Sequence, residues 1–237
     1  MTTKSLSNKL ALVTGASRGI GAATAKALAA AGAHVILVAR TTGGLEEIED
    51  AIHNAGGSAT IAPLDLTDGD SIARLAAAIG GRWDALDALI LNAATLGSLT
   101  PVAQIEPKEL SEVMTLNFIA QQALIAAFDP LLRNAQAGRL IAMTSSVGRC
   151  PRAYWGAYGA SKAALETLVE AYGQEVAKLT PIRTAIVDPG STRTKMRESA
   201  FPGEDPATLK SPDVVGEAIA ELLTGDFETG YRTRIDS

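Results

Sequence analysis

Short runs of apolar residues alternate with longer amphipathic segments along most of this chain of 237 residues. Continuous apolar runs are typical of strands buried on both faces, and the segments between them have the length and spacing of helices. The pattern predicts strands over residues 10–14, 34–39, 59–62, 88–91, 139–144, 183–187 and, weakly, 231–235. It predicts helices over residues 19–31, 44–55, 68–79, 109–132, 157–178 and 213–223.

This alternation predicts an α/β fold, a doubly wound Rossmann-type domain with a seven-stranded parallel sheet and helices on both faces. We expect residues 1–237 to form a single domain, because no internal repeat and no linker rich in Pro, Gly or Ser interrupts the pattern. Residues 192–212 differ from the rest, since they form a polar segment with three prolines after a predicted strand. A short substrate lid would lie there.

Composition and charge exclude several classes of protein. Apolar residues make up 47% of the chain and the net charge is −5. We therefore expect no electrostatic binding to nucleic acid or anionic lipid. No apolar run is long enough to cross a membrane, and residues 1–9 lack the apolar stretch of a secretory signal. The one cysteine, Cys150, fits packing better than a redox role and indicates a cytoplasmic protein. His34 and His53 have no companions at metal-ligand spacing, so we expect no metal site.

A glycine-rich turn follows the first predicted strand. Residues 14–21 read TGASRGIG, directly before an Ala-rich helix. The first glycine would free the turn, the second would leave room for a phosphate, and the third would let helix and strand pack closely. The amides and dipole of the helix N-terminus stabilise anionic phosphates, so this setting favours a dinucleotide site over a plain turn. The predicted contacts are Gly15, Ser17, Arg18, Gly19, Ile20 and Gly21.

The end of the second strand indicates which dinucleotide is bound. An acidic side chain there would hold a free ribose 2′-hydroxyl, but the chain has Arg40 and no carboxylate until Glu46. Arg40 and Arg18 would suit a 2′-phosphate, because guanidinium groups form forked hydrogen bonds with phosphate. We therefore favour NADP(H) over NAD(H). Two solvated surface arginines are the alternative interpretation.

Two further strand ends carry candidate cofactor contacts. Asp65, followed by Leu66, comes after the third strand, and its carboxylate would either accept a hydrogen bond from an adenine amino group or cap the next helix. Asn92 and Ala93 follow the fourth strand, where small residues would let the backbone run beside the adenine-side ribose.

The candidate chemistry lies in the second half of the chain. Tyr158 and Lys162 are one helical turn apart on the same face, where an ammonium would lower the pKa of the phenol from its ordinary value near 10. Ser145, at the end of the fifth strand, would hydrogen-bond the substrate oxygen, with Ser146 as the neighbouring alternative. Asn117 interrupts an apolar stretch and would bind a water that relays protons to Lys162. Each residue alone also fits a structural role.

Together these motifs make the chain similar to a short-chain dehydrogenase/reductase over nearly its whole length. The turn at residues 14–21 and Asp65 match the family's cofactor site, and residues 188–194 (DPGSTRT) match its Pro-Gly turn. The residues that match its Asn-Ser-Tyr-Lys tetrad are Asn117, Ser145, Tyr158 and Lys162. The resemblance implies that Pro189, Gly190, Thr192 and Thr194 lie near the nicotinamide, and that Tyr158 and Lys162 also contact the cofactor.

The resemblance also implies an activity and an assembly. A hydride would pass between NADP(H) and the carbonyl or alcohol carbon of a small apolar ketone, aldehyde or secondary alcohol. Tyr158 would be the acid, Lys162 would tune its pKa and anchor the ribose, and Ser145 would position the carbonyl. The family usually forms homodimers or homotetramers. Two departures are Thr95, where a glycine is usual, and the end at residues 236–237, which lacks the usual glycine pair.

The substrate pocket would gather apolar side chains from the loops after three central strands. The candidates are Leu96, Tyr154, Trp155, Met196 and Phe201, of which Tyr154 and Trp155 fit the core equally well. A non-catalytic dinucleotide sensor or scaffold is the alternative function, although such proteins tend to lose the Tyr or the Lys. Chemistry on nucleotide sugars would need a larger C-terminal substrate domain.

Overall fold

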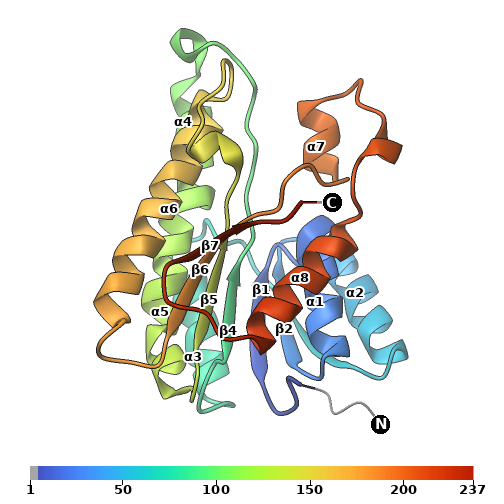
Figure 1. Ribbon diagram of the computed structural model, residues 1–237, viewed down its shortest axis with the longest axis vertical. Helices are drawn as coiled ribbons and strands as arrows, with labels where there is room; N and C mark the ends of the chain where they lie inside the picture. The colour runs from blue at the N-terminus through green and yellow to red at the C-terminus, as the bar shows by residue number, and fades with distance from the viewer. Residues whose placement is uncertain (1–4, 237) are drawn as a thin grey trace.

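The computed structural model describes residues 5–236. Its centre is a sheet of seven parallel strands, as the sequence predicts (Figure 1). The strand order is β3-β2-β1-β4-β5-β6-β7. The strands are β1 (Leu10–Thr14), β2 (His34–Ala39), β3 (Ser58–Pro63), β4 (Ala88–Leu91), β5 (Arg139–Met143), β6 (Arg183–Asp188) and β7 (Tyr231–Arg234). The order reverses between β1 and β4, and ligands of doubly wound sheets bind at the carboxyl end of such a reversal.

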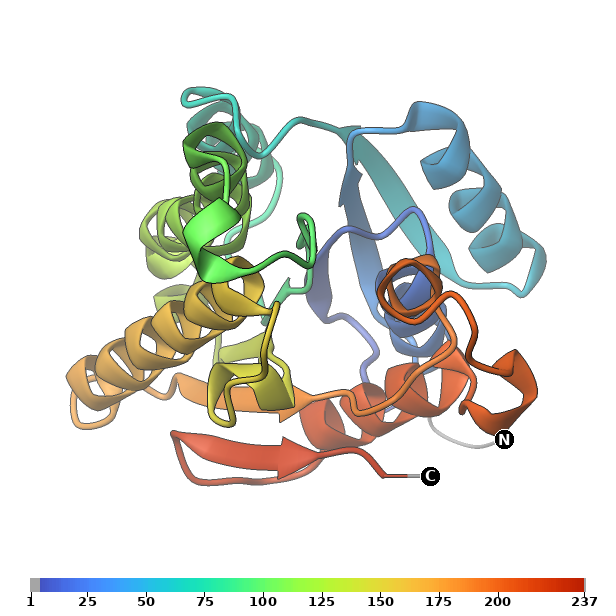
Figure 2. The same cartoon turned by 90° about the horizontal axis from the view of Figure 1, so that it is seen from above.

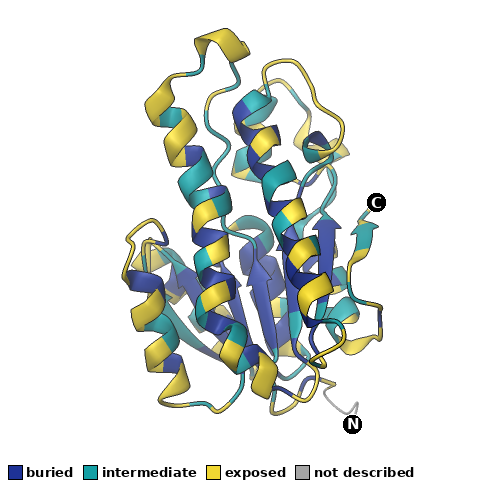
Figure 3. Cartoon of the chain, turned by 90° about the vertical axis from the view of Figure 1, so that its left-hand side faces the viewer, coloured by how far each residue is buried: buried dark blue, intermediate teal, exposed yellow. Residues whose placement is uncertain are grey.

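Helices cover both faces of this sheet. The helices are α1 (Gly19–Ala30), α2 (Thr42–Asn54), α3 (Ser71–Gly80), α4 (Pro107–Met114), α5 (Ala120–Asn134), α6 (Gly156–Val176), α7 (Lys195–Ala200) and α8 (Pro212–Thr224). Figure 1 shows α1, α2 and α8 on one face and α3, α5 and α6 on the other. Figure 3 shows the second group from outside, with the central strands coloured as buried behind helices that expose one side.

The central strands β1, β2, β4 and β5 are largely apolar because alternate residues enter two different cores. Leu10 and Leu12 of β1 pack with α3, α5 and α6, whereas Ala11 and Val13 pack with α1, α2 and α8. Successive side chains of a strand point to opposite faces, so a sheet covered on both sides has no polar positions along its central strands. The apolar runs thus predict both the strands and their double covering.

The largest departure from the predicted elements lies in the segment expected to be one helix over 109–132. It consists of α4 and α5 joined by a π-helical turn, Thr115–Ile119, which contains Asn117. A π-turn adds a residue without interrupting the apolar pattern, so periodicity does not reveal it. A second departure is α7, which lies inside the predicted lid and begins where Thr194 Oγ1 accepts a hydrogen bond from Arg197 N at 3.1 Å. Other element ends differ from prediction by up to three residues.

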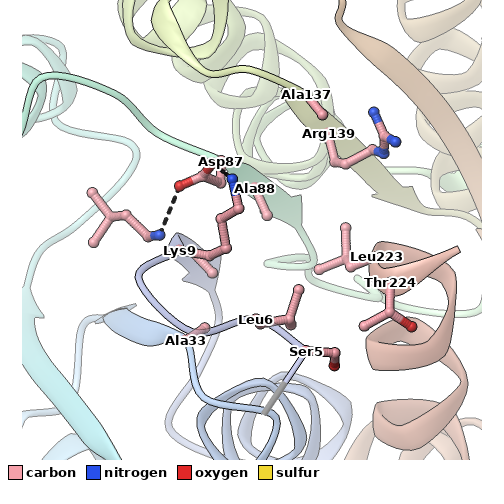
Figure 4. A pocket seen from close by; sticks show the side chains of 12 residues that line it. Ser5, Leu6, Lys9, Ala33, Asp87, Ala88, Ala137, Arg139, Leu223 and Thr224 are labelled. Atoms are coloured by element: carbon pink, nitrogen blue, oxygen red, sulfur yellow. Dashed lines mark hydrogen bonds and ion pairs between the residues drawn. The ribbon is translucent and has the colours of Figure 1, made fainter. Parts of the chain in front are cut away.

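A cavity of about 140 Å³ lies at the amino ends of β1, β4 and β5, the opposite edge of the sheet from the predicted site (Figure 4). Asp87 beside it accepts hydrogen bonds of 2.9 Å from Lys9 Nζ and from Leu10 N. This ion pair ties the first strand to the fourth at their starts. Among residues 5–236, no helix is both long and apolar enough to span a membrane.

Candidate active site

Tyr158 and Lys162 lie on the first two turns of α6, against the end of β5. Both are buried, Tyr158 with 7% and Lys162 with 2% of its surface exposed. Lys162 Nζ is 5.7 Å from the centre of the Tyr158 ring and donates a 2.8 Å hydrogen bond to the carbonyl of Met143, the last residue of β5. The structure thus brings the predicted phenol and ammonium together at the carboxyl edge of the sheet.

Burial dominates the protonation of this pair. Burial raises the pKa of the Tyr158 phenol above its ordinary value, and the charge of Asp188 acts in the same direction. Burial lowers the pKa of the Lys162 ammonium to about 8, against the opposing charge of Glu166. The prediction that the Tyr158 pKa lies below its ordinary value is therefore wrong for this structure, because burial of the phenol and the charge of Asp188 both raise it. The phenol is held neutral, which is the form that a proton donor needs.

Ser145 lies two residues after the end of β5 and has extended backbone, with φ −158° and ψ 151°. The short turn Ser146–Gly148 comes next and packs closely on the first turn of α6. A Cβ on Gly159 would lie 2.9 Å from the carbonyl oxygen of Val147, so glycine is required at this contact. Ser145 is thereby placed beside the segment that carries Tyr158. Cys150, expected to be packed, is instead exposed.

Asn117 is fully buried in the π-turn and clamps the loop after β4 to α6. Its Oδ1 accepts from Thr95 N at 2.8 Å, and its Nδ2 donates to Thr95 O at 2.8 Å and to Ser161 Oγ at 3.0 Å. Ser161 Oγ in turn donates to the Tyr158 carbonyl at 2.7 Å. These bonds satisfy the amide that the apolar stretch would otherwise leave without partners. The relay of protons through a water bound by Asn117 stays a prediction. Thr95, which stands where the family usually has glycine, is the residue whose backbone Asn117 binds.

The glycine turn has the backbone that its sequence predicts. Gly15 and Gly19 have φ of +67° and +58°, in the region that favours glycine. A Cβ on Gly21 would lie 2.2 Å from Gly15 O, so only glycine fits where α1 meets the turn. Beside Gly19, the nearest atom to an added Cβ is Thr194 Cγ2 at 3.5 Å, so the start of the lid lies against this turn.

Thr14 and Asn92 join the ends of β1 and β4 beneath the turn. Thr14 Oγ1 donates to Ile90 O at 3.1 Å and accepts from Asn92 N and Ala93 N at 3.0 and 3.1 Å. Asn92 Nδ2 donates to Thr14 O at 2.8 Å. The Asn92 side chain thus holds the glycine turn in place, and the predicted contact of the backbone at Asn92 and Ala93 with the cofactor stays a prediction.

The Pro-Gly turn follows β6 and leads into the lid. Asp188 Oδ1 accepts from Gly190 N at 2.9 Å, and Gly190 has φ +63°. The buried Thr192 donates from Oγ1 to Pro189 O at 3.0 Å. These bonds direct the chain toward α7, which lies over α1 when the molecule is seen from above (Figure 2).

Met196 and Phe201 of the lid lie near Tyr158 together with Trp155, which directly precedes α6. The Tyr158 hydroxyl lies 3.9 Å from Met196 Sδ, its sulfur acceptor. The Trp155 ring lies 6.0 Å from the Tyr158 ring and 5.7 Å from the Phe201 ring. Three predicted pocket residues therefore gather at the phenol. Tyr154 is 58% exposed with φ +74°, so it is not a core residue.

Comparison with known proteins identifies this arrangement. The sequence model of the short chain dehydrogenase family matches residues 9–205. The chain belongs to the short-chain dehydrogenase/reductase family of oxidoreductases. An uncharacterized oxidoreductase of Escherichia coli, YciK, is 39% identical to this dehydrogenase over 210 residues, which cover 87% of this chain and 82% of that protein.

Solved structures show the same fold throughout. A short chain dehydrogenase from Shigella flexneri, complexed with NADP, has a TM-score of 0.91 and 36% identity, covering 98% of this chain and 99% of its own. One from Escherichia coli, complexed with NADPH, has a TM-score of 0.91 and 37% identity, covering 99% of both chains.

The far end of the predicted cofactor site in this dehydrogenase is open to solvent. Arg18, Arg40 and Asp65 are all exposed. Asp65 Oδ1 accepts from Thr67 N at 2.9 Å and from Thr67 Oγ1 at 2.7 Å, and these bonds, with the charge of Arg40, lower the pKa of its carboxyl. Asp65 closes a turn rather than capping α3, which begins only at Ser71. The side chain of Leu66, predicted to contact cofactor, is buried in the core.

The sequence motifs predict no role for one charged residue near this site, Glu166. Glu166 lies four residues after Lys162 on α6, is buried, and is the group whose charge opposes the effect of burial on Lys162. The spacing of Lys162 and Glu166 on one helix face is a signal that could have found it.

Proposed function

We propose that this dehydrogenase passes a hydride between NADP(H) and the carbonyl or alcohol carbon of a small apolar ketone, aldehyde or secondary alcohol. One observation carries the proposal: Thr194 lies against Gly19 of the glycine turn, and Met196, two residues on, lies against the Tyr158 hydroxyl. The glycine turn, as the proposed phosphate site, and Tyr158, as the proposed proton donor, therefore lie on either side of the segment 194–196. A nicotinamide dinucleotide spans such a pair of sites.

The choice of NADP(H) is supported by charge and by the relatives. Arg18 and Arg40 are exposed at the end where a 2′-phosphate would lie, and α1 has no acidic residue in its first turn. Two related structures were solved with NADP and NADPH. The residues proposed to hold the cofactor are Gly15, Ser17, Arg18, Gly19, Ile20, Gly21, Arg40, Asp65, Leu66, Asn92, Ala93, Tyr158, Lys162, Pro189, Gly190, Thr192 and Thr194. Leu66 would contribute its backbone only.

The bound nucleotide supplies or accepts the hydride at the substrate carbon. In reduction, Tyr158 donates its proton to the substrate oxygen as the carbon–oxygen double bond becomes single, which yields the alcohol. Lys162 stabilises the phenolate left behind, and solvent returns the proton. Ser145 orients the substrate oxygen, and Asn117 holds the α6 segment that carries Tyr158 and Lys162. Trp155, Met196 and Phe201 favour an apolar substrate, with residues 192–212 as its lid.

The assembly and the location of the protein belong to the same proposal. Leu110 of α4 and Ile119 of the π-turn are exposed by 38% and 55%, which supports a homodimer or homotetramer built on these helices. The single free cysteine supports a cytoplasmic location. We treat residues 1–237 as one domain that contains both the cofactor site and the catalytic residues.

A panel of ketones, aldehydes and alcohols, followed by NADPH absorbance, tests the activity. We expect turnover with at least one apolar carbonyl compound, and stronger binding of NADPH than of NADH. NADPH binding without turnover of any compound would contradict the catalytic proposal and favour the sensor function. Binding of neither nucleotide would contradict both.

A further inference from the structure

The proposed mechanism does not use a buried carboxylate that lies one turn beyond Lys162. Glu166 is 5% exposed, although ionised side chains are rarely buried unless they are paired. It lies four residues after Lys162 on α6, so both side chains share a helix face. Its charge acts on Lys162 in the direction that keeps the ammonium protonated.

Three segments hold the Glu166 carboxylate. Thr144 at the end of β5 donates to Oε1, while Arg149 Nε and Arg232 Nη1 donate to Oε2 at 3.1 and 2.7 Å. Burial alone would raise the pKa of Glu166, but the hydrogen bonds from Thr144, Arg232 and Arg149 outweigh it and lower the pKa. Glu166 is therefore ionised at neutral pH. Because Thr144 precedes Ser145, the same carboxylate also anchors the strand end that carries the proposed carbonyl-positioning serine.

Arg232 connects this carboxylate to the last strand. It lies on β7 and also donates to Glu170 Oε1, from Nε at 2.8 Å and from Nη2 at 2.5 Å. Glu166 and Glu170 are on successive turns of α6, but Glu170 has a 42% exposed side chain whereas that of Glu166 is 6% exposed. The guanidinium of Arg232 therefore partly neutralises Glu166, which weakens the effect of the carboxylate on the Lys162 ammonium.

The Glu166 carboxylate binds Thr144, and the Lys162 ammonium binds the carbonyl of the preceding residue, Met143, so both groups lie at the same strand end. We propose that Glu166 is a positioning residue that keeps the Lys162 side chain charged there, and that Arg232 limits this effect. The charged or titratable groups that face Lys162 are Tyr158 and Glu166 from α6, with Asp188 of β6 acting on Tyr158. Removing Glu166 takes away the anion that favours the ammonium. Removing Arg232 takes away a competing cation. The two changes must therefore affect Lys162 in opposite directions.

An NMR titration of the full chain, with isotope-labelled lysine side chains and no added nucleotide, reads this effect directly. Lys162→Ala identifies the resonance, which we expect to titrate near pH 8 in the parent. Glu166→Gln should lower the midpoint by about one pH unit, and Arg232→Gln should raise it. Glu170→Gln is the matched control, because it removes a carboxylate from the next turn that also binds Arg232. We expect a much smaller shift for this control.

An unchanged midpoint in Glu166→Gln would overturn the proposal, as would an equal shift in Glu170→Gln. General damage to the fold would shift the Lys162 midpoint in the same direction in Glu166→Gln and Arg232→Gln. Such a result would also contradict the proposal. If Glu166→Gln does not fold, the upward shift in Arg232→Gln still decides the question, and Glu166→Asp should keep the parental midpoint.

The consequence for cofactor binding rests on the proposed function and has its own readout. Fluorescence titration with NADPH near pH 9 should show Glu166→Gln losing affinity about tenfold, since above both midpoints one pKa unit changes the protonated fraction of Lys162 tenfold. A parent protein that binds no NADPH at any pH would contradict the proposed function. The NMR midpoints would still test the role of Glu166.

Discussion

At the scale of single residues, the site depends on where polar groups are buried. Tyr158 and Lys162 are both removed from solvent, and burial disfavours the charged form of each. The pKa of Lys162, about 8, means that its ammonium is present at neutral pH and is lost as the pH rises through that value. The phenol stays protonated over the same range. Reduction, which consumes a proton from Tyr158, is therefore suited to neutral pH.

Tyr158→Phe should retain NADPH binding and lose turnover by about 10²–10⁴-fold, the usual contribution of a general acid. The measurement is kcat with the best substrate from the carbonyl panel, together with NADPH affinity. Tyr231→Phe is the matched control, because it removes an exposed phenol on β7, away from the predicted substrate pocket, and should keep parental activity. Activity of Tyr158→Phe within tenfold of the parent would contradict its role as acid.

Arg40→Asp should shift the preference from NADPH toward NADH. A charged hydrogen bond contributes about 1.5–3 kcal/mol, so the ratio of the two kcat/KM values should change by about tenfold to a hundredfold. Arg74→Asp makes the same charge change on α3 and should leave the ratio unchanged. A ratio that does not move in Arg40→Asp would count against the contact with the 2′-phosphate.

At the scale of elements, the geometry of the cofactor turn depends on how closely α1 approaches the end of β1. Helix α1 can meet the turn only because Gly21 has no side chain, and Asn92 Nδ2 would lie 2.6 Å from an added Cβ. The π-turn between α4 and α5 similarly orients Asn117 toward Thr95 and Ser161. In both places the local backbone, rather than the residue alone, positions the functional group.

Gly21→Ala should destabilise the protein by about 1–3 kcal/mol or more, because the added methyl overlaps backbone atoms that cannot move freely. Thermal unfolding should show a lower Tm, and NADPH affinity should fall with it. Gly43→Ala is the control, since a Cβ there meets nothing within 4 Å and alanine is the better helix former on α2. Equal Tm values for the two variants would show that the turn tolerates a side chain.

At the scale of the whole molecule, the sheet brings distant segments to one edge. The turns after β1, β4, β5 and β6 all leave the carboxyl end of parallel strands, so residues near 15, 92, 145 and 189 converge there. The cavity lies at the amino ends of the strands and is separated from these residues by the length of the strands. The lid crosses from β6 toward α1 and joins the cofactor turn to Tyr158.

The amino-acid sequence by itself determined the fold class, the parallel strands and the positions of the glycine turn, Tyr158 and Lys162. These are local properties, set by apolar periodicity and by the backbone freedom of glycine. The tertiary structure alone decided the environment of each group. It showed that burial raises the Tyr158 pKa, that Asn92 and Asn117 bind backbone groups, and that Glu166 contacts Arg232 from the last strand. Desolvation and contacts between distant segments depend on packing, which periodicity does not encode.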